Sequence, residues 1–182
     1  ISSSRADFGQ LKNLIFLLNK DKNIKLYLIV TGSHFSKDKG LSIKEISGSK
    51  INISKKLNVK IKKFTPESIS NYTSETVKGI SKIISQLNPH ILLLLGDRYE
   101  TFAAATACLI HNIPLAHLHG GEVTAGVIDE PLRHSITKMS DIHFTANGLF
   151  RSRIIKMGEN KKNIFNVGSL TAENIKGMKF YK

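Results

Sequence analysis

The sequence is poor in several features, and each shortage excludes a class of protein. Its 182 residues include a single cysteine, Cys108, so no disulfide can form within the chain. Cys108 lies in the apolar stretch 103–110, and a buried free thiol suits the reducing cytoplasm. No apolar run approaches the roughly 18 residues that would span a membrane, and no signal-peptide pattern precedes the first helical segment. We therefore expect a cytoplasmic protein without a membrane partner.

Acidic residues are also scarce: 14 Asp and Glu stand against 27 Lys and Arg, for a formal net charge of +13. Such an excess is typical of nucleic-acid-binding proteins. The basic residues, however, are scattered through 20–63 and 156–182 among Asn, Ser and Ile, and no zinc-finger, RNA-recognition or basic-zipper pattern accompanies them. We interpret the charge as a Lys-rich solvated surface that also attracts an anionic ligand, such as a nucleoside diphosphate, and expect no nucleic-acid partner.

The few carboxylates are unevenly placed. Five of the fourteen fall between positions 97 and 130, in a segment that is otherwise apolar and rich in glycine. Carboxylates in such surroundings need a chemical reason, because an unpaired charge is costly to remove from water. The five are Asp97, Glu100, Glu122, Asp129 and Glu130.

Apolar runs along the chain predict strands. The run 91–95 consists of five apolar residues bounded by Pro89 and Gly96, which is typical of a central parallel strand buried on both faces. Residues 1–3 resemble the end of a strand, and 59–64 is a weak candidate for an edge strand. The remaining strands are expected at 24–30, 113–118, 142–145 and 164–167.

Helical periodicity fills the intervals between these strands. Asp7 is a candidate N-cap for the first helix, and Pro66 and Asn88 bound the longest one. The alternation predicts an α/β fold with a doubly wound, Rossmann-like parallel sheet. We place one domain at residues 1–170 and interpret 171–182 as a tail or linker, because its charged residues have no evident partner element. The other helices are expected at 101–110, 129–139 and 149–157, with a short one near 41–46.

Polar and glycine residues follow four of the predicted strands. The carboxyl ends of parallel strands meet at one edge of a sheet, and ligands gather there. We therefore expect one site at that edge. The four segments are Ser4-Arg5-Ala6-Asp7, Gly96-Asp97-Arg98, His119-Gly120-Gly121-Glu122 and Gly168-Ser169.

Several of these residues also fit purely structural roles. Arg5, near a helix N-terminus, could bind phosphate or be an ordinary surface residue beside a cap. Asp97 could cap the next helix or pair with Arg98, or it could be a partly buried carboxyl with a raised pKa. Asp129 and Glu130 suit the first turn of a helix in any protein.

Cofactor patterns are weak. The GxGxxG fingerprint is missing, which argues against NAD or FAD. His117, His119 and Glu122 could bind a metal, but no third histidine or cysteine follows at ligand spacing. The paired glycines 120 and 121 more simply let the backbone approach a ligand closely. We expect no metal and no cofactor.

Taken together, these motifs resemble those of one family, the hydrolysing UDP-N-acetylglucosamine 2-epimerases. The resemblance runs through essentially the whole chain in the same order. Its most specific part is the combination of residues 119–122 with residues 129–138. Ser4–Asp7 and Val167-Gly168-Ser169 are similar to that family's first strand–helix turn and to a later strand end. The main segments are Gly96-Asp97-Arg98-Tyr99-Glu100, His117-Leu118-His119-Gly120-Gly121-Glu122-Val123-Thr124, Ile128-Asp129-Glu130 and Arg133-His134-Ser135-Ile136-Thr137-Lys138.

This resemblance implies the N-terminal half of a glycosyltransferase-B-like fold, whose active site lies between two domains, with a C-terminal domain missing here. It implies a nucleotide-sugar substrate, with UDP-N-acetylglucosamine and water giving N-acetylmannosamine and UDP through a glycal. Asp97, Glu122 and Asp129 would be the catalytic carboxylates. We also expect self-association into a homo-oligomer, because the open cleft exposes apolar surface. The expected substrate-binding residues are Arg5, Arg98, His119, Glu130, Arg133, His134 and Ser169.

Three alternatives stay open at this level. The chain could be a truncated, non-catalytic module that binds a sugar nucleotide. It could belong to a hydrolysing epimerase of a related UDP- or GDP-linked diacetamido sugar, because the base is recognised mainly by the other domain. A non-hydrolysing epimerase, in which the nucleotide adds back, is disfavoured by the His119-Gly120-Gly121-Glu122 form of the motif.

Overall fold

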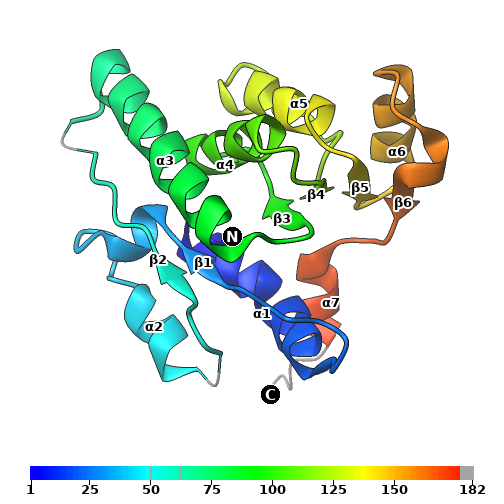
Figure 1. Cartoon of the computed structure of the whole chain (residues 1–182). Coiled ribbons are helices and arrows are strands. Elements are labelled where there is room, and N and C mark those ends of the chain that lie inside the picture. The colour runs from blue at the N-terminus through cyan, green and yellow to red at the C-terminus, as the bar shows by residue number, and fades with distance from the viewer. Residues whose placement is uncertain (50, 62, 177–182) are drawn as a thin grey trace, which may run out of the picture.

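Parallel strands with helices on both sides organise the chain (Figure 1). The computed structural model describes residues 1–49, 51–61 and 63–176. Its main sheet contains β3 (Leu92–Leu95), β4 (Leu115–Leu118), β5 (Ile142–Thr145) and β6 (Ile164–Asn166), in that order and all parallel. A smaller parallel pair is formed by β1 (Ile29–Val30) and β2 (Lys55–Lys56).

The N-terminal residues connect these two sheets. The Ser2 amide donates a hydrogen bond to the Ile29 carbonyl at 3.0 Å, and the α-ammonium group of Ile1 donates to the Leu93 carbonyl at 3.2 Å. Residues 1–3 therefore run between β1 and β3, and Ser2 forms an isolated parallel bridge with Val30 where the end of a strand was predicted. The strand order reverses beside this segment, and such a reversal is where open α/β sheets bind ligands.

Helices cover both faces of the sheet, which confirms the predicted α/β, doubly wound architecture (Figure 1). One face carries α1 (Arg5–Lys20), α2 (Ile43–Gly48) and α7 (Leu170–Lys176). The other carries α3 (Pro66–Leu87), α4 (Tyr99–Ile110), α5 (Asp129–Lys138) and α6 (Gly148–Lys156). Two 3₁₀ turns, η1 (Gly32–Phe35) and η2 (Lys161–Asn163), lie in the connections.

Apolar side chains pack around β3 and α4 in the interior of the protein. Leu92 and Leu94 pack on the side of α3 and α4, while Leu95 packs on the side of α1, so β3 is buried on both faces. In α4 the alanines 103, 104, 105 and 107 are fully buried. Small side chains allow this helix to lie close to the sheet. The apolar contacts on the two faces of β3 and around α4 stabilise the position of the segment that joins them.

Three local predictions need correction. Ser4, not Asp7, is the N-cap of α1, because its hydroxyl accepts a hydrogen bond from the Asp7 amide at 3.2 Å. The edge strand predicted at 59–64 is wrong among the described residues of that range, and Lys62 lies outside them. The outer strand is β2, where two consecutive lysines show no alternation of apolar and polar residues that could have revealed it.

The third correction concerns the chain's last described residues. Asn174 Nδ2 donates to the carbonyls of Gly9 and Gln10 at 2.9 and 3.1 Å, and its Oδ1 accepts from Asn13 at 2.7 Å. The tail therefore does have a partner element, α1, as far as residue 176, and residues 177–182 lie outside the description. The prediction that 171–182 leads into a second domain remains a prediction.

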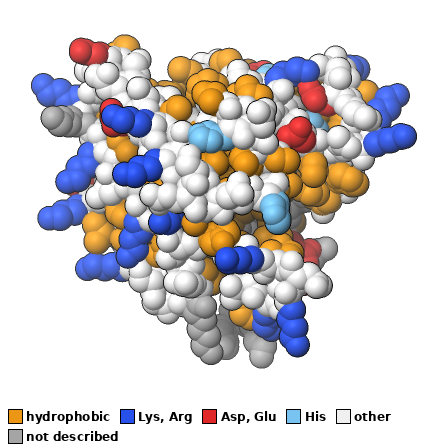
Figure 2. Space-filling model, in the orientation of Figure 1, with side chains coloured by type: hydrophobic (Ala, Val, Ile, Leu, Met, Phe, Trp, Pro, Cys, Tyr) orange, Lys and Arg blue, Asp and Glu red, His pale blue; other side chains and the backbone are white. Residues whose placement is uncertain are grey.

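The surface carries the excess of basic residues in a dispersed form. Figure 2 shows Lys and Arg side chains singly and in small groups around the visible face, separated by polar and apolar surface. No helix within residues 1–49, 51–61 and 63–176 is long and apolar enough to cross a membrane.

Candidate functional site

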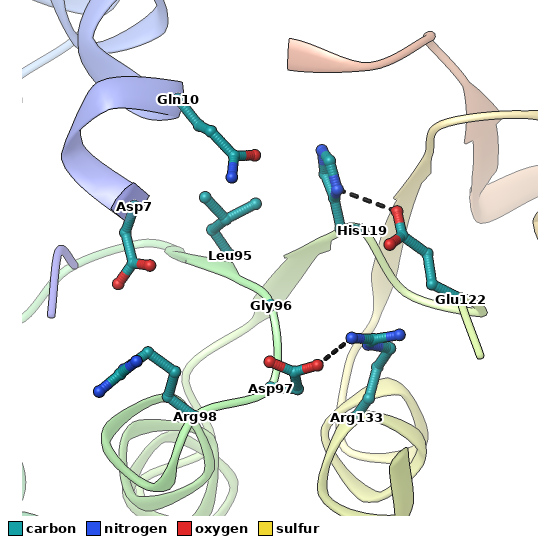
Figure 3. A pocket seen from close by; sticks show the side chains of 9 residues that line it. All are labelled: Asp7, Gln10, Leu95, Gly96, Asp97, Arg98, His119, Glu122 and Arg133. Atoms are coloured by element: carbon teal, nitrogen blue, oxygen red, sulfur yellow. Dashed lines mark hydrogen bonds and ion pairs between the residues drawn. The ribbon is translucent and has the colours of Figure 1, made fainter. Parts of the chain in front are cut away.

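A hollow opens at the carboxyl edge of the sheet, beside the reversal in strand order (Figure 3). Its volume is about 170 Å³, which is smaller than the roughly 300–1,000 Å³ of sites that enclose a whole small-molecule ligand. One side is formed from α1 and the start of α4, and the other from the segment after β4 and from α5. Its lining consists of Asp7, Gln10, Leu95, Gly96, Asp97, Arg98, His119, Glu122 and Arg133.

Asp97 lies at the floor of the hollow and pairs with Arg133. Arg133 Nη2 donates a hydrogen bond to Asp97 Oδ2, and both side chains are largely buried. Burial raises the pKa of the Asp97 carboxyl, and the nearby Asp129 charge adds to the rise, although Arg133 opposes both. The raised pKa agrees with the predicted partly buried carboxyl, whereas the partner is Arg133 and not the neighbouring Arg98.

Glu122 lies across the hollow with its own partner, His119. The His119 Nδ1 atom is 2.9 Å from Glu122 Oε1. Burial acts to raise the pKa of Glu122, but the hydrogen bond and charge of His119 outweigh it, with a further contribution from Arg133, so the pKa is lowered. Because a carboxylate only accepts, Nδ1 carries the proton, and the buried Nε2 atom has no protein partner among the described residues. His119 also has a φ of 65°, an uncommon conformation for a residue other than glycine.

The glycine pair between these two residues is required by protein packing. A Cβ atom on Gly121, whose φ is +77°, would lie 2.5 Å from the Phe150 carbonyl oxygen. A Cβ on Gly120 would lie 3.0 Å from His117 Nδ1. The close approach therefore joins this turn to α6 and to β4, and the approach of the glycines to a ligand stays a prediction. The same packing also fixes the turn from which Glu122 projects.

Arg98 lines the side of the hollow that is formed by the start of α4, away from Glu122 and Arg133 (Figure 3). Its Nε atom is 3.4 Å from Glu100 Oε2, and Glu100 is buried in the first turn of α4. The other Glu100 oxygen accepts a hydrogen bond from the Tyr72 hydroxyl of α3 at 2.7 Å. Arg98 is thus held by a buried carboxylate while 40% of its side chain stays exposed, an arrangement that leaves its guanidinium available to an anion.

Five other predicted site residues lie outside the lining of the hollow. Asp129 and Glu130 are in the first turn of α5, and His134 Nε2 is 3.6 Å from Glu130 Oε1. Arg5 is exposed and pairs with Glu45 at 3.3 Å, and Ser169 precedes α7. Asp129 is near enough for its charge to act on Asp97, and the functional roles of these five residues stay predictions.

Asp7 and Gln10 of α1 also line the hollow. Asp7 belongs to a segment predicted at this edge of the sheet, although it was expected to be a helix cap, and Gln10 was not predicted at the site. They lie three positions apart in α1, a spacing that puts both side chains on one face of a helix. The Asp7 carboxylate accepts hydrogen bonds from the Ser3 amide at 3.1 Å, the Ser3 hydroxyl at 2.5 Å and the Ser4 hydroxyl at 2.7 Å. A carboxylate already occupies this helix start, which makes it a poorer phosphate site than the sequence suggested. The Gln10 Oε1 atom is buried and without a partner among the described residues.

Within residues 1–49, 51–61 and 63–176 there is no group of three or more His, Cys, Asp or Glu side chains that could hold a metal ion. His117 Nε2 is instead 2.8 Å from the Gly96 carbonyl oxygen, and its Nδ1 is 3.2 Å from Thr137 Oγ1.

Comparisons with known proteins identify the family to which the chain is similar. The profile of the family described as UDP-N-acetylglucosamine 2-epimerase matches residues 17–181. The GDP/UDP-N,N'-diacetylbacillosamine 2-epimerase (hydrolyzing) of Campylobacter jejuni is 39% identical over 180 residues, which cover 99% of this chain and 47% of that protein. The polysialic acid biosynthesis protein P7 of Escherichia coli is 38% identical over 96% of this chain and 44% of its own.

A solved structure shows the same fold. The crystal structure of a UDP-N-acetylglucosamine 2-epimerase superposes with a TM-score of 0.86 at 21% identity and covers 98% of this chain. Only 49% of that structure's chain is matched. The chain therefore spans about half the length of the relatives that it matches, and the fold it shares with them is glycosyltransferase-B-like.

Proposed function

Because the chain belongs to the UDP-N-acetylglucosamine 2-epimerase family, we propose that it forms the N-terminal half of a hydrolysing sugar-nucleotide 2-epimerase. The reaction converts a nucleoside-diphosphate-linked 2-acetamido sugar and water into the free 2-epimeric sugar and the nucleoside diphosphate. One observation carries the proposal. Asp97 and Glu122 line one hollow, and their pKa values are shifted in opposite directions.

Two carboxyls of different acidity suit the chemistry. Elimination removes the proton from C2 while the anomeric C–O bond breaks, which leaves a glycal and the nucleoside diphosphate. Addition then places a water oxygen on C1 and a proton on the opposite face of C2. One group must accept a proton and another must deliver one, and opposite pKa shifts prepare two carboxyls for that division of work. Asp129 is the third proposed carboxylate, and its charge already acts on Asp97.

The departing diphosphate needs positive charge. Arg98 is partly exposed at the edge of the hollow and is held by Glu100, so it is the best placed of the proposed phosphate ligands. Positive groups fixed where negative charge develops lower the barrier to leaving-group departure. The remaining proposed contacts to the substrate come from Arg5, His119, Glu130, Arg133, His134 and Ser169.

A second half of the protein is part of the proposal. The hollow is too small for a whole sugar nucleotide, and the chain spans 47% of its Campylobacter jejuni relative. A C-terminal domain would supply the opposite wall and exclude water. Leu149 and Val167, which follow β5 and β6, have exposed fractions of 77% and 56%. Exposed apolar side chains after these strand ends support the expectation that the carboxyl edge of the sheet is covered by that domain or by a second copy.

The sugar has two candidates. UDP-N-acetylglucosamine follows from the family description. A UDP- or GDP-linked N,N'-diacetamido sugar is favoured by the 39% identity to the Campylobacter jejuni enzyme, whose name specifies such a substrate. The two differ at C4 and C6, away from the reacting C1 and C2, so the same carboxylates serve both.

Product analysis tests the proposal. The full-length protein is incubated with each candidate, with and without a chelator, and the products are separated and identified by mass spectrometry and NMR. Release of the free 2-epimeric sugar and of the nucleoside diphosphate, unaffected by chelator, is expected. A 2-epimer still attached to nucleotide would identify a non-hydrolysing epimerase, and binding without turnover would identify a non-catalytic module.

A further inference from the structure

His117 lies directly beneath the hollow without lining it. It is the third residue of β4 and is fully buried. Its side chain faces the layer of α5, where Nδ1 is 3.2 Å from Thr137 Oγ1, while Nε2 is 2.8 Å from the Gly96 carbonyl oxygen. Both ring nitrogens therefore have a partner, one in the β3–α4 connection and one in α5.

The protonation of the ring follows from these partners. A carbonyl oxygen only accepts, so His117 Nε2 carries a proton and donates it to Gly96. Burial lowers the pKa of His117 to about 4, and the ring is therefore neutral near pH 7. A neutral ring with a proton on Nε2 has a lone pair on Nδ1, which faces the Thr137 hydroxyl. That hydroxyl has one proton, which it shares between the Arg133 carbonyl oxygen at 3.0 Å and His117 Nδ1 at 3.2 Å. The ring is thus held by Gly96 at Nε2 and contacts Thr137 through Nδ1.

The two partners of His117 carry the two members of the Asp97–Arg133 pair. Gly96 is bonded directly to Asp97, so a hydrogen bond to its carbonyl restrains the peptide that sets the Asp97 side chain. Thr137 lies one turn after Arg133 in α5, and its hydroxyl is also 3.0 Å from the Arg133 carbonyl. His117 is thus a bridge between the two segments that must stay in register for Asp97 to meet Arg133.

We propose that His117 is a positioning residue that holds Asp97 and Arg133 in their reactive arrangement by bridging the Gly96 carbonyl and Thr137. This inference rests on the proposed function, because it assigns His117 to the site where that reaction would occur. A displacement of about 1 Å at a reacting group can cost on the order of 100-fold in rate. Loss of His117 should therefore lower kcat. Binding of the sugar nucleotide should change little, because His117 does not line the hollow.

His143 offers a matched control. It is buried on the adjacent strand, is paired in register with His117, and also has a pKa that burial lowers. Its Nε2 atom is 3.6 Å from Glu159, away from the hollow. A change at His143 removes a buried imidazole from the same face of the sheet without touching the bridge.

The test compares four variants of the full-length protein: His117→Gln, His117→Asn, His117→Leu and His143→Gln. A glutamine amide nitrogen can occupy the place of Nε2 and keep the bond to Gly96, whereas asparagine is too short and leucine has no donor. Steady-state kcat and KM for the sugar nucleotide are measured per folded protein, with the folded fraction taken from thermal unfolding. Thr137→Val and Thr137→Ser form a second pair, in case the His117 variants do not fold.

We expect kcat to fall about 10- to 100-fold in His117→Asn and His117→Leu, with KM within about threefold, and to be largely restored in His117→Gln. His143→Gln should match the wild type, and Thr137→Val should lower kcat more than Thr137→Ser. Equal kcat in all folded His117 variants, or in both Thr137 variants when the His117 variants do not fold, overturns the inference alone. A wild type that releases no nucleoside diphosphate from any candidate overturns the proposed function and the inference with it.

Discussion

Asp97 and Arg133 are 36 positions apart in the chain, yet Arg133 Nη2 donates a hydrogen bond to Asp97 Oδ2 at the floor of the hollow. The pair joins the end of β3 to α5, so the site depends on the packing of two separate crossover units. Arg133 Nε and Nη1 are buried and have no protein partner among the described residues. Unpaired buried donors are costly, and the proposed substrate-binding role of Arg133 would offset that cost only if the hollow opens enough for substrate oxygen atoms to reach these donors.

Replacement of the carboxylate of Asp97 or of Glu122 should nearly abolish turnover of the full-length protein while leaving it folded. Removal of a general acid or base costs on the order of 10²–10⁴-fold in rate, so we expect losses in that range for Asp97→Asn and Glu122→Gln. Asp97→Asn weakens a largely buried pair and should lower the free energy of unfolding by about 1–2 kcal/mol. Glu122→Gln keeps an acceptor for His119 and should cost about 1 kcal/mol or less.

Glu159 provides the control for that experiment. It is a largely buried carboxylate that pairs with Lys138 and His143, outside the lining of the hollow. Glu159→Gln should change stability by a similar amount and leave turnover intact. Turnover retained by Asp97→Asn or Glu122→Gln would show that these carboxylates only stabilise the fold.

The sequence allowed the edge of the sheet to be predicted because local patterns determine where strands end. The apolar run before Gly96 predicted a buried strand, and residues at its carboxyl end had to share a rim with those that follow β4. Asp97, Arg98, His119, Glu122 and Arg133 accordingly line one hollow.

Pairings across the fold could not be predicted in the same way. Arg98 is adjacent to Asp97 in the chain, but as the N-cap residue of α4 it pairs with Glu100, while α5 brings Arg133 to Asp97. Gln10 on α1 and Asn174 on α7 likewise acquired their roles from the packing of helices far apart in sequence. Such contacts depend on tertiary geometry, which periodicity and spacing do not specify.

Gly121→Ala should damage both stability and turnover. The new Cβ would lie 2.5 Å from the Phe150 carbonyl oxygen at a φ of +77°, so the backbone must shift and carry Glu122 with it. We expect a loss of at least about 2 kcal/mol in the free energy of unfolding. Gly126→Ala is the matched control, because Gly126 has a φ of +82° but open space around it. It should cost about 1 kcal/mol, and equal effects of the two variants in denaturant titrations would contradict the packing argument.

The isolated 182-residue chain should fold but be nearly inactive. Its core is continuous on both faces of the sheet, so folding should not need a second domain. Turnover needs water excluded from both sides of the sugar, and the hollow is open. Circular dichroism, thermal unfolding and a turnover assay on the purified chain check this. Activity near that of the full-length protein would show that the active site is misplaced.

Stability of the isolated chain should fall as the pH drops from about 6.5 to about 4. Burial lowers the folded-state pKa of His117 from 6.5 to about 4, so in this window the unfolded state takes up a proton that the folded state does not. The linked loss for His117 is about 3 kcal/mol, and it is absent above pH 6.5. Burial also lowers the pKa values of His34 and His143, which adds to the loss.

Urea unfolding of the wild type and of His117→Gln at several pH values measures the His117 contribution. Glutamine does not titrate, so the curve of stability against pH should be flatter for the variant by that amount. Parallel curves for the two proteins would mean that His117 is not a buried neutral imidazole.

We propose that carboxylates at this edge of the sheet move a proton at C2 while the anomeric bond is broken. Turnover of the sugar nucleotide by the full-length protein in D₂O, followed by NMR and mass spectrometry of the released sugar, measures that proton transfer. The finished product incubated in D₂O without enzyme is the control. We expect one deuterium at C2 of a free sugar whose C2 configuration is inverted. A released sugar that keeps hydrogen and its original configuration at C2 would contradict the proposal, because simple hydrolysis of the sugar–nucleotide bond would then be the whole reaction.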